Sequence, residues 1–376
     1  MANPNAVVST IIRIDPPLDR APVEMLRAAA GISVELEGGL KARLDPANTR
    51  SPGFATLLDA LGKQRLPVYL EIEPSTSVIT RLLIPQIARV ASLSPIDTGV
   101  LGVDLYPSHA RHVVRRDRPD FDVLERDLRE ALRSGEPLIV TEDDGHGIID
   151  IRPFKPGPDG PLPPPPFPSL PKPLPWPWRW FSEWLRRIWQ IWCWPWRCFR
   201  CTSMARATQV FNAMSATSCA PLTVSAPCIP FLYPDDGCWA RAHEMCRLIR
   251  NQGLTPKKVW IQGRLYVSTK NNPLCGVWWG WHVAPTLCVR GPQLFQTQEM
   301  VIDPSLFNSP VTKATWKSLQ GDPNASLTAT DGSIYWLWSG DTDPGYLKTN
   351  DRLAYYRLRL QSRAIQVGPP PYTNCP

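Results

Sequence analysis

The chain has 376 residues, of which 43% are hydrophobic and 20% charged, and this length predicts two domains, or two domains and a linker. No uncharged apolar run is long enough to cross a membrane, and the first residues lack the basic and apolar segments of a secretory signal. We therefore expect no ordinary membrane span, and a chain that is cytoplasmic or exported by a leaderless route.

Charge divides the chain into two unlike halves. Residues 1–150 carry 17 Lys and Arg against 22 Asp and Glu, whereas residues 151–376 carry 24 against 12. A basic half is typical of a protein that meets nucleic acid, an anionic membrane, an acidic protein or its own acidic half. Because no RRM, KH, zinc-finger or helix-turn-helix pattern is present, we predict no specific nucleic-acid partner.

Residues 1–152 predict a small acidic α+β domain of unknown role. Three roles stay open for it: to deliver, to recognise or to restrain the second half. Its three histidines, His109, His112 and His146, are spaced for neither a metal site nor a triad, and we interpret them as surface or turn residues. Periodicity predicts strands and helices in alternation: strands at 7–14, 67–73, 99–106, 137–141 and 147–153, and helices at 22–30, 54–61 and 120–135.

Two segments of biased composition follow. Residues 153–177 contain 13 prolines in 25 positions, which predicts an extended polyproline linker, either a semi-rigid spacer or a docking site for an aromatic-grooved partner. Eight of the 16 tryptophans then lie in residues 176–196, and residues 178–201 read as a basic, Trp-rich amphipathic segment. Three roles stay open for it: packing inside the protein, binding to a membrane surface, or binding to a partner protein.

All ten cysteines lie beyond residue 192. They form either a disulfide framework or a set of reduced thiols with one reactive member, and both alternatives stay open. Cys198 and Cys201 form a lone CxxC that lacks the second ligand pair of a structural zinc site, so we predict no metal and no cofactor. Five others lie among apolar residues and are interpreted as core thiols or disulfide partners: Cys219, Cys228, Cys246, Cys275 and Cys288.

Residues 202–376 predict a cysteine-dependent catalytic domain. The turn at 234–237 precedes a helix that begins at Cys238, where unpaired N–H groups and the positive end of the helix dipole stabilise a thiolate and offer an oxyanion hole. His282 lies in an apolar strand, and Asp303 ends the next one. These side chains can converge, in the chain order of papain-like and transglutaminase-like cysteine enzymes.

We expect this domain to be α+β, with the Cys238 helix packed on an antiparallel sheet and covered by a final helix near 350–364. The expected strands are 258–262, 264–268, 276–285, 300–304 and 333–338. Trp239 and Trp281 are candidates for the substrate cleft or oxyanion site, and Arg241 and His243 for support behind the catalytic residues. His243 is five residues after Cys238 and rotated away from it, which makes it a poor base.

At these residues the sequence resembles the protein-glutaminase (protein-glutamine deamidase) family. The resemblance covers about residues 205–345 and rests on GCWARAHEM at 237–245, WHVAP at 281–285 and IDPSL at 302–306, with intervals of 44 and 21 residues between the Cys, His and Asp. It implies a Cys-His-Asp triad that hydrolyses an accessible Gln side chain of a protein substrate through a thioester. The residues alone leave open a transglutaminase, a cysteine peptidase, or a non-catalytic interaction protein that uses the Pro-rich and Trp-rich segments.

Overall fold

The fold is that of a computed structural model, which describes residues 3–18, 21–28, 31–156, 201–269, 271, 276–291, 293 and 296–371. Most of the predicted polyproline linker and Trp-rich segment therefore lie outside the described residues. Among the helices of the described ranges, none is long and apolar enough to cross a membrane.

The first part of the chain forms two small antiparallel sheets and the helices α1 and α2. One sheet has the order β1-β5-β6 and the other β2-β3-β4. The single strand expected at 7–14 divides at Thr10 into β1 and β2, which join different sheets, and β3, β4 and β6 were not predicted. The elements are β1 (Ala6–Ser9), β2 (Ile11–Asp15), α1 (Pro22–Ala28), β3 (Ile32–Leu36), β4 (Lys41–Leu44), α2 (Ser51–Lys63), β5 (Val68–Ile72) and β6 (Ile79–Leu83).

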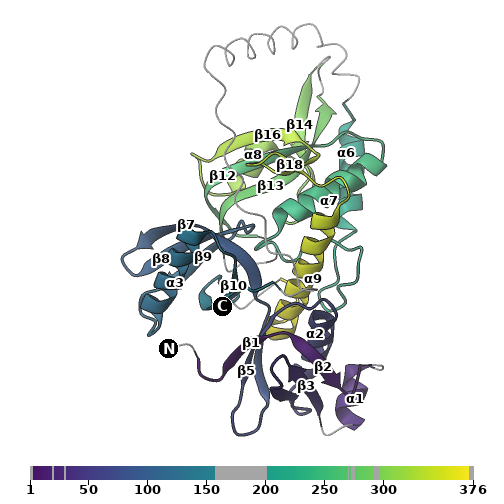
Figure 1. The fold of residues 1–376 in the computed structure, drawn as a ribbon. Helices are drawn as coiled ribbons and strands as arrows, with labels where there is room; N and C mark the ends of the chain where they lie inside the picture. Colours follow the sequence, from purple (N-terminus) through teal and green to yellow (C-terminus); the bar gives the residue numbers. More distant parts are fainter. Residues whose placement is uncertain are drawn as a thin grey trace.

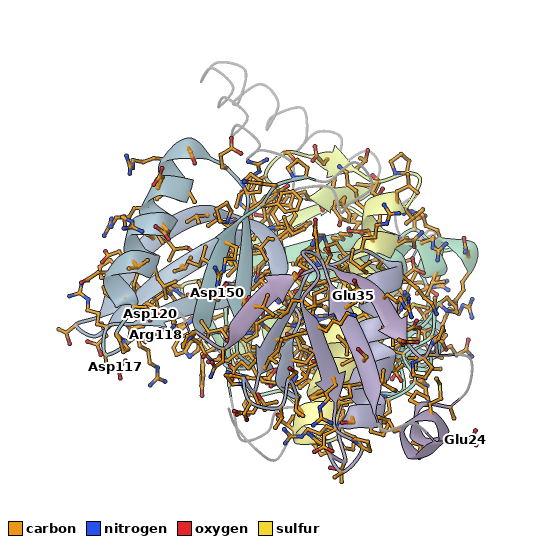
Figure 2. The ribbon with its side chains drawn as sticks, turned by 60° about the horizontal axis from the view of Figure 1, so that its bottom comes forward. Glu24, Glu35, Asp117, Arg118, Asp120 and Asp150 are labelled. Atoms are coloured by element: carbon orange, nitrogen blue, oxygen red, sulfur yellow. A yellow bond between two sulfur atoms is a disulfide. The ribbon has the colours of Figure 1, made fainter. Side chains whose placement is uncertain are left out.

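A five-stranded antiparallel sheet follows, in the order β11-β10-β7-β8-β9, and α3 packs against it with its apolar face. Arg118 ties the start of α3 to β11, since its guanidinium pairs with Asp120 and donates to the carbonyls of Ile148 and Ile149. Figure 2 labels Arg118 and Asp120 side by side at this end of the sheet. The elements are β7 (Gln86–Asp97), β8 (Val100–Tyr106), β9 (Arg111–Arg115), α3 (Phe121–Ser134), β10 (Leu138–Glu142) and β11 (Ile148–Pro153).

The last part is a second five-stranded antiparallel sheet, in the order β15-β14-β13-β12-β16, with α7 packed on β13. The strands expected at 258–262 and 264–268 are one strand, β12, whose register shifts between Gln262 and Leu265. Its elements are α6 (Met204–Ser215), α7 (Cys238–Asn251), β12 (Lys257–Val267), β13 (Val277–Arg290), β14 (Thr297–Val301), β15 (Val311–Thr312), α8 (Lys313–Leu319) and β16 (Ser326–Asp331).

The mixed helix and antiparallel-sheet class expected for this part is confirmed, with one correction. The strand expected at 333–338 does not join the main sheet, because β17 (Ile334–Trp336) pairs with the short β18 (Asp341–Thr342) and β16 takes the edge position beside β12. The aromatic side chains of β17 instead pack over α7, where Trp336 contacts Trp239 edge to face.

The final helix, α9 (Leu347–Val367), joins the two halves of the molecule. It packs on α7 at one end and on α2 at the other, as its position in Figure 1 shows. A Cβ on Gly53 of α2 would lie 2.7 Å from the Ile365 side chain, so the two helices touch closely there. One continuous cluster of buried side chains contains Leu57, Phe211 and Tyr356, and the acidic first half thus packs directly on its own basic second half.

Two disulfides lie in the described part of the second half, which favours the disulfide alternative for these cysteines. Cys201 bonds to Cys288 of β13, and Cys219 bonds to Cys228 in the loop before α7. Within the described ranges, Cys238 and Cys246 are the free thiols. Cys201 is therefore not paired with its CxxC neighbour, and Cys275 lies outside the described residues.

Candidate active site

The turn before Cys238 is held from three directions. Gly237 has φ +83°, and a Cβ there would lie 2.4 Å from the Tyr356 ring, so only glycine fits. The Asp236 carboxylate accepts the Gly237 N–H at 2.8 Å and the Tyr356 hydroxyl at 2.7 Å. The buried Arg241 guanidinium donates to the carbonyls of Tyr233 and Asp236. These contacts fix Cys238 at the first position of α7.

His282 of β13 and Asp303, two residues after the end of β14, form a buried pair. His282 Nε2 lies 2.9 Å from Asp303 Oδ2, and the same oxygen accepts the Trp316 indole N–H at 2.9 Å. Burial raises the pKa of Asp303, but the hydrogen bonds from His282 and Trp316 outweigh it and hold the pKa below its ordinary value. The His282 ring is stacked on Trp279, with ring centroids 4.6 Å apart, which fixes its plane.

The three residues predicted as a triad lie together. The Cys238 sulfur lies within 4.8 Å of a ring nitrogen of His282, and both residues are 1% exposed. Because Asp303 accepts the Nε2 proton, His282 Nδ1 is left free, and it has no hydrogen-bond partner among the described residues. A thiol beside the bare nitrogen of a carboxylate-oriented imidazole can be deprotonated by it.

The other predicted site residues lie in different places. Trp239 is fully buried and donates to the Tyr335 hydroxyl at 3.0 Å, whereas Trp281 lines a cavity of about 340 Å³. Arg241 braces the turn before Cys238, as described above. His243 faces away from the site: its Nδ1 lies 2.9 Å from Lys258 Nζ, and burial together with the Lys258 charge lowers the pKa of His243 to about 3.

Sequence reasoning was wrong about the histidines of the first half, which are buried rather than at the surface or in exposed turns. His109, His112 and His146 are 1%, 0% and 5% exposed. They were missed because their contacts are non-local. His109 Nδ1 lies 2.7 Å from Asp236 Oδ1, a partner 127 residues later in the chain. Burial lowers the pKa of His109 to about 4, so its imidazole is neutral.

The segment 108–110 lies along β13 beside Cys238 and His282. The His109 carbonyl accepts the Gly280 N–H at 3.0 Å, and Ala110 pairs with Trp279 of β13 in an antiparallel bridge. The segment therefore lies along β13 as a short added strand and places the His109 ring 5.7 Å from the His282 ring. The 340 Å³ cavity next to it is walled by Trp281, Trp336 and Trp338.

This arrangement corrects the expected thiolate at Cys238. Burial raises the pKa of the Cys238 thiol well above its ordinary value, and the Arg241 charge opposes the rise without cancelling it. The helix N-terminus is present as predicted, but the segment 108–110 excludes the water that a thiolate needs. In this closed arrangement Cys238 is therefore a protonated, inaccessible thiol.

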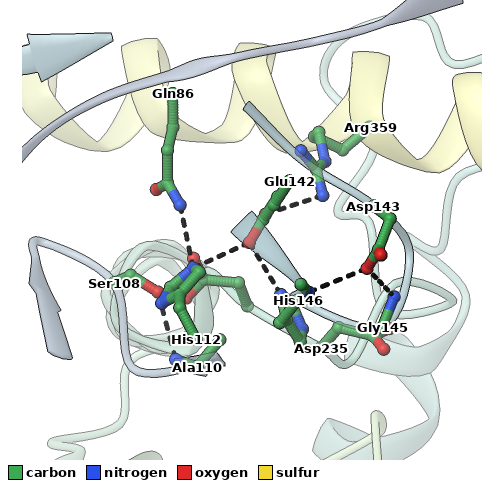
Figure 3. A network of polar contacts seen from close by, with 12 residues as sticks. Gln86, Ser108, Ala110, His112, Glu142, Asp143, Gly145, His146, Asp235 and Arg359 are labelled. Carbon is green, nitrogen blue, oxygen red and sulfur yellow. Dashed lines mark hydrogen bonds and ion pairs between the residues drawn. The ribbon is translucent and has the colours of Figure 1, made fainter. Parts of the chain in front are cut away.

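A second buried cluster joins the first half to α9 (Figure 3). Glu142 accepts from His112 Nε2 at 2.8 Å, from His146 Nδ1 at 3.0 Å and from Arg359 at 2.8 Å. Burial raises the pKa of Glu142, but the surrounding positive groups, His112 first, outweigh it and hold the pKa well below its ordinary value. Burial likewise disfavours the His146 cation, yet the Glu142 carboxylate raises the pKa of His146 overall.

This cluster predicts a loss of stability as pH rises. A raised pKa in the folded state means that the contribution of His146 is complete below the ordinary histidine pKa and disappears as pH rises through the folded-state value. We expect the melting temperature of the protein to fall as pH rises above about 6.5, the ordinary histidine pKa, and to fall less in His146→Asn, which also suits the left-handed backbone at φ 60°. Thermal scans of both proteins at increasing pH test this. A fall of equal size in both would contradict the assignment to His146.

The chain is similar to known proteins in sequence and in fold. Residues 207–320 match the family model described as glutaminase. The chain is similar to a crystal structure of pro-protein-glutaminase (22% identity over 73% of this chain and 93% of that chain, TM-score 0.49). It is also similar to a crystal structure of protein-glutaminase (33% identity, 42% and 89%, TM-score 0.38) and to the NMR structure of protein-glutaminase from Chryseobacterium proteolyticum (34%, 40% and 84%, TM-score 0.36).

A comparison with curated proteins returns no significant match. The glutaminase model spans Cys238, His282 and Asp303 together with the motifs on which the resemblance rests. The resemblance is thereby confirmed: this chain belongs to the protein-glutaminase family and is an amidohydrolase.

Proposed function

We propose that this protein hydrolyses the side-chain amide of glutamine residues in a protein substrate, releasing ammonia and leaving glutamate, with Cys238 as the nucleophile. The observation that carries the proposal is the buried meeting of Cys238 with His282, whose Nδ1 has no hydrogen-bond partner among the described residues and whose Nε2 is held by Asp303 at 2.9 Å. Membership of the protein-glutaminase family supports the amide as the substrate group.

In the first half of the reaction, His282 takes the Cys238 proton and the thiolate attacks the amide carbon of the glutamine side chain. The oxyanion lies against the N–H groups of the first turn of α7, which have no acceptor within the helix. The His282 cation then protonates the leaving nitrogen, the C–N bond breaks, and ammonia departs from a thioester on Cys238.

In the second half, His282 removes a proton from water, which attacks the thioester carbon. The C–S bond breaks, the proton returns from His282 to the sulfur, and glutamate is released. Asp303 stays ionised throughout, because the hydrogen bonds that it accepts from His282 and Trp316 keep its pKa low. Its role is to hold the proton on Nε2 and to stabilise the cation that forms in both halves.

Substrate access requires the segment 108–110 to leave β13. The segment covers Cys238 and occupies the backbone edge that an extended substrate would use, since Gly280 N–H is already bonded to the His109 carbonyl. Of the three roles open for residues 1–152, this favours restraint of the catalytic half.

The test is incubation of the purified protein, freed of residues 1–152, with a glutamine-containing protein, followed by an ammonia assay and mass spectrometry of the substrate. The expected result is ammonia in amounts equal to the Gln-to-Glu conversions at intact peptide bonds. Cleavage of the substrate backbone would replace the proposal by a peptidase, and absence of any modification would remove it.

Competition between water and an amine separates a hydrolase from a transglutaminase, which share every step up to the thioester. We expect mostly glutamate at the modified site even with excess primary amine, because a hydrolytic cleft admits water to the thioester. The aromatic walls of Trp281, Trp336 and Trp338 make the measurement necessary, since such walls also exclude water. Predominant amine incorporation with little glutamate, quantified by mass spectrometry, would identify a transglutaminase.

A further inference from the structure

Three metal-binding side chains from both halves of the chain meet at one buried point. They are His109 from the loop between β8 and β9, Cys238 at the start of α7, and His282 on β13. One ligand atom of each lies within 4.8 Å of those of the other two. Each of the three side chains is 1% exposed. The set is one thiol and two imidazoles, which is the donor chemistry that zinc prefers.

Two carboxylates orient the imidazoles toward this point. Asp236 Oδ1 lies 2.7 Å from His109 Nδ1, and Asp303 Oδ2 lies 2.9 Å from His282 Nε2. At His282 the carboxylate accepts the Nε2 proton and leaves Nδ1 with a free lone pair, whereas at His109 the Asp236 oxygen lies close to Nδ1 without an aligned hydrogen bond. The opposite ring atoms, His109 Nε2 and His282 Nδ1, are buried and have no hydrogen-bond partner within the part of the chain that the structure describes. A histidine held by a carboxylate is also how proteins present imidazole to zinc.

We propose that the closed form of this protein binds a zinc ion between His109, Cys238 and His282. A zinc ion with bonds of about 2.0 to 2.3 Å needs ligand atoms roughly 3.5 Å apart, so the side chains move inward by about 1 Å from their present limit of 4.8 Å. Binding replaces the thiol proton of Cys238 by the metal and releases that proton to solvent. The fourth position is left for a water molecule.

The second cluster, His112, Glu142 and His146, also has buried ring nitrogens without a partner among the described residues, but its carboxylate is already neutralised. Its histidines direct their contacting nitrogens at the Glu142 carboxylate itself, and the Arg359 guanidinium lies 2.8 Å from the same group. A fixed guanidinium already neutralises that carboxylate and repels a cation. At Cys238 two carboxylates, Asp236 and Asp303, lie behind the histidines and favour a cation, while the Arg241 guanidinium donates to the carbonyls of Tyr233 and Asp236 and binds neither carboxylate side chain in the described contacts.

The zinc would bridge the two halves of the chain, because His109 belongs to the first and the other two ligands to the second. It would hold the segment 108–110 in the cleft and cap the sulfur of Cys238. Metal binding needs only the geometry of the three side chains and does not depend on the reaction that Cys238 performs.

Cobalt(II) absorption tests the site in the full chain, with disulfides intact and bound metal first removed by a chelator under anaerobic conditions. We expect a thiolate-to-cobalt charge-transfer band and the intense visible bands of tetrahedral cobalt. One component of this absorption should saturate at one equivalent of cobalt per chain, and added zinc should abolish it. Cys238→Ser should abolish this component, whereas Cys246→Ser, which removes the other described free thiol of α7, should retain it.

The contribution of the first half is tested by His109→Gln, which keeps a hydrogen bond to Asp236, and by the milder Asp236→Asn. We expect both to weaken cobalt affinity at least about tenfold. Circular dichroism confirms that each variant is folded; if His109→Gln is not, Asp236→Asn decides. No thiolate band in the wild type, a band that survives Cys238→Ser, or an affinity unchanged in the folded variants would overturn the proposal.

Discussion

Replacing Cys238 with alanine is expected to lower ammonia release from a glutamine-containing protein by at least about a thousandfold, with the fold unchanged. The Cys238 side chain is buried and small, and alanine keeps its Cβ, so the loss of activity is expected to come from the missing thiol rather than from a change of fold. Cys238→Ser is expected to be almost as inactive, because a hydroxyl is a far weaker nucleophile at neutral pH. Both variants are assayed with residues 1–152 removed, and circular dichroism checks the fold.

The matched control is Cys246→Ser, two turns further along α7. Cys246 is equally buried and free, but it lies near Lys258 rather than His282, so its loss is expected to leave turnover nearly unchanged. His282→Ala is expected to be nearly as damaging as Cys238→Ala, and Asp303→Asn less so, because asparagine keeps a hydrogen bond but favours the wrong tautomer. Near-normal turnover in Cys238→Ala would remove the triad assignment.

The intact chain is expected to release ammonia at least about a hundredfold more slowly than the chain freed of residues 1–152. Turnover scales with the fraction of molecules whose cleft is open, and a cleft open in about 1% of molecules gives this factor. The experiment introduces a protease site into the Pro-rich stretch at 153–177, immobilises the catalytic part, and removes the N-terminal fragment in mild denaturant. Returning the fragment is expected to restore the block.

A second measurement keeps this prediction testable if the separated part loses its fold. In the intact chain, with a chelator present, His109→Ala is expected to accelerate alkylation of Cys238 by iodoacetamide, because it removes the imidazole that covers Cys238 and the ring contact with Asp236, although the backbone bond to Asp236 remains. Cys246 serves as the buried reference thiol. Equal alkylation rates in the wild type and His109→Ala, or full activity of the intact chain, would contradict the expectation.

The meeting of Cys238, His282 and Asp303 was predictable because its signals are local. Cys238 follows a Pro-Asp-Asp-Gly turn and opens a periodic helix, His282 lies in an apolar strand, and Asp303 follows the end of the next strand. The turn also held a residue that was read only as a turn former: Asp236 contacts Gly237, His109 and Tyr356. Tyr356 and His109 are each more than 100 residues from it, and no periodicity connects such partners.

Strands of the first half were missed for related reasons. β7 contains Pro95, which argues against a strand interior, and the structure accommodates it where the register with β8 shifts. β3 and β4 form a hairpin around Gly38 and Gly39, and only their short alternation marked them. The burial of His112 and His146 came from the Glu142 cluster and α9, which no local pattern reports.

The shared contacts of α9 also set the order in which the molecule is completed during synthesis. The first half emerges from the ribosome early, but the helix that closes its hydrophobic cluster against α2 is made after every other described helix and strand. Arg359 of that helix also pairs with Glu142, which until then has His112 and His146 of the first half as its described partners. A nascent chain therefore carries His109 and its segment before Cys238 is made, and the helix that ties the two halves together is made last among the described elements.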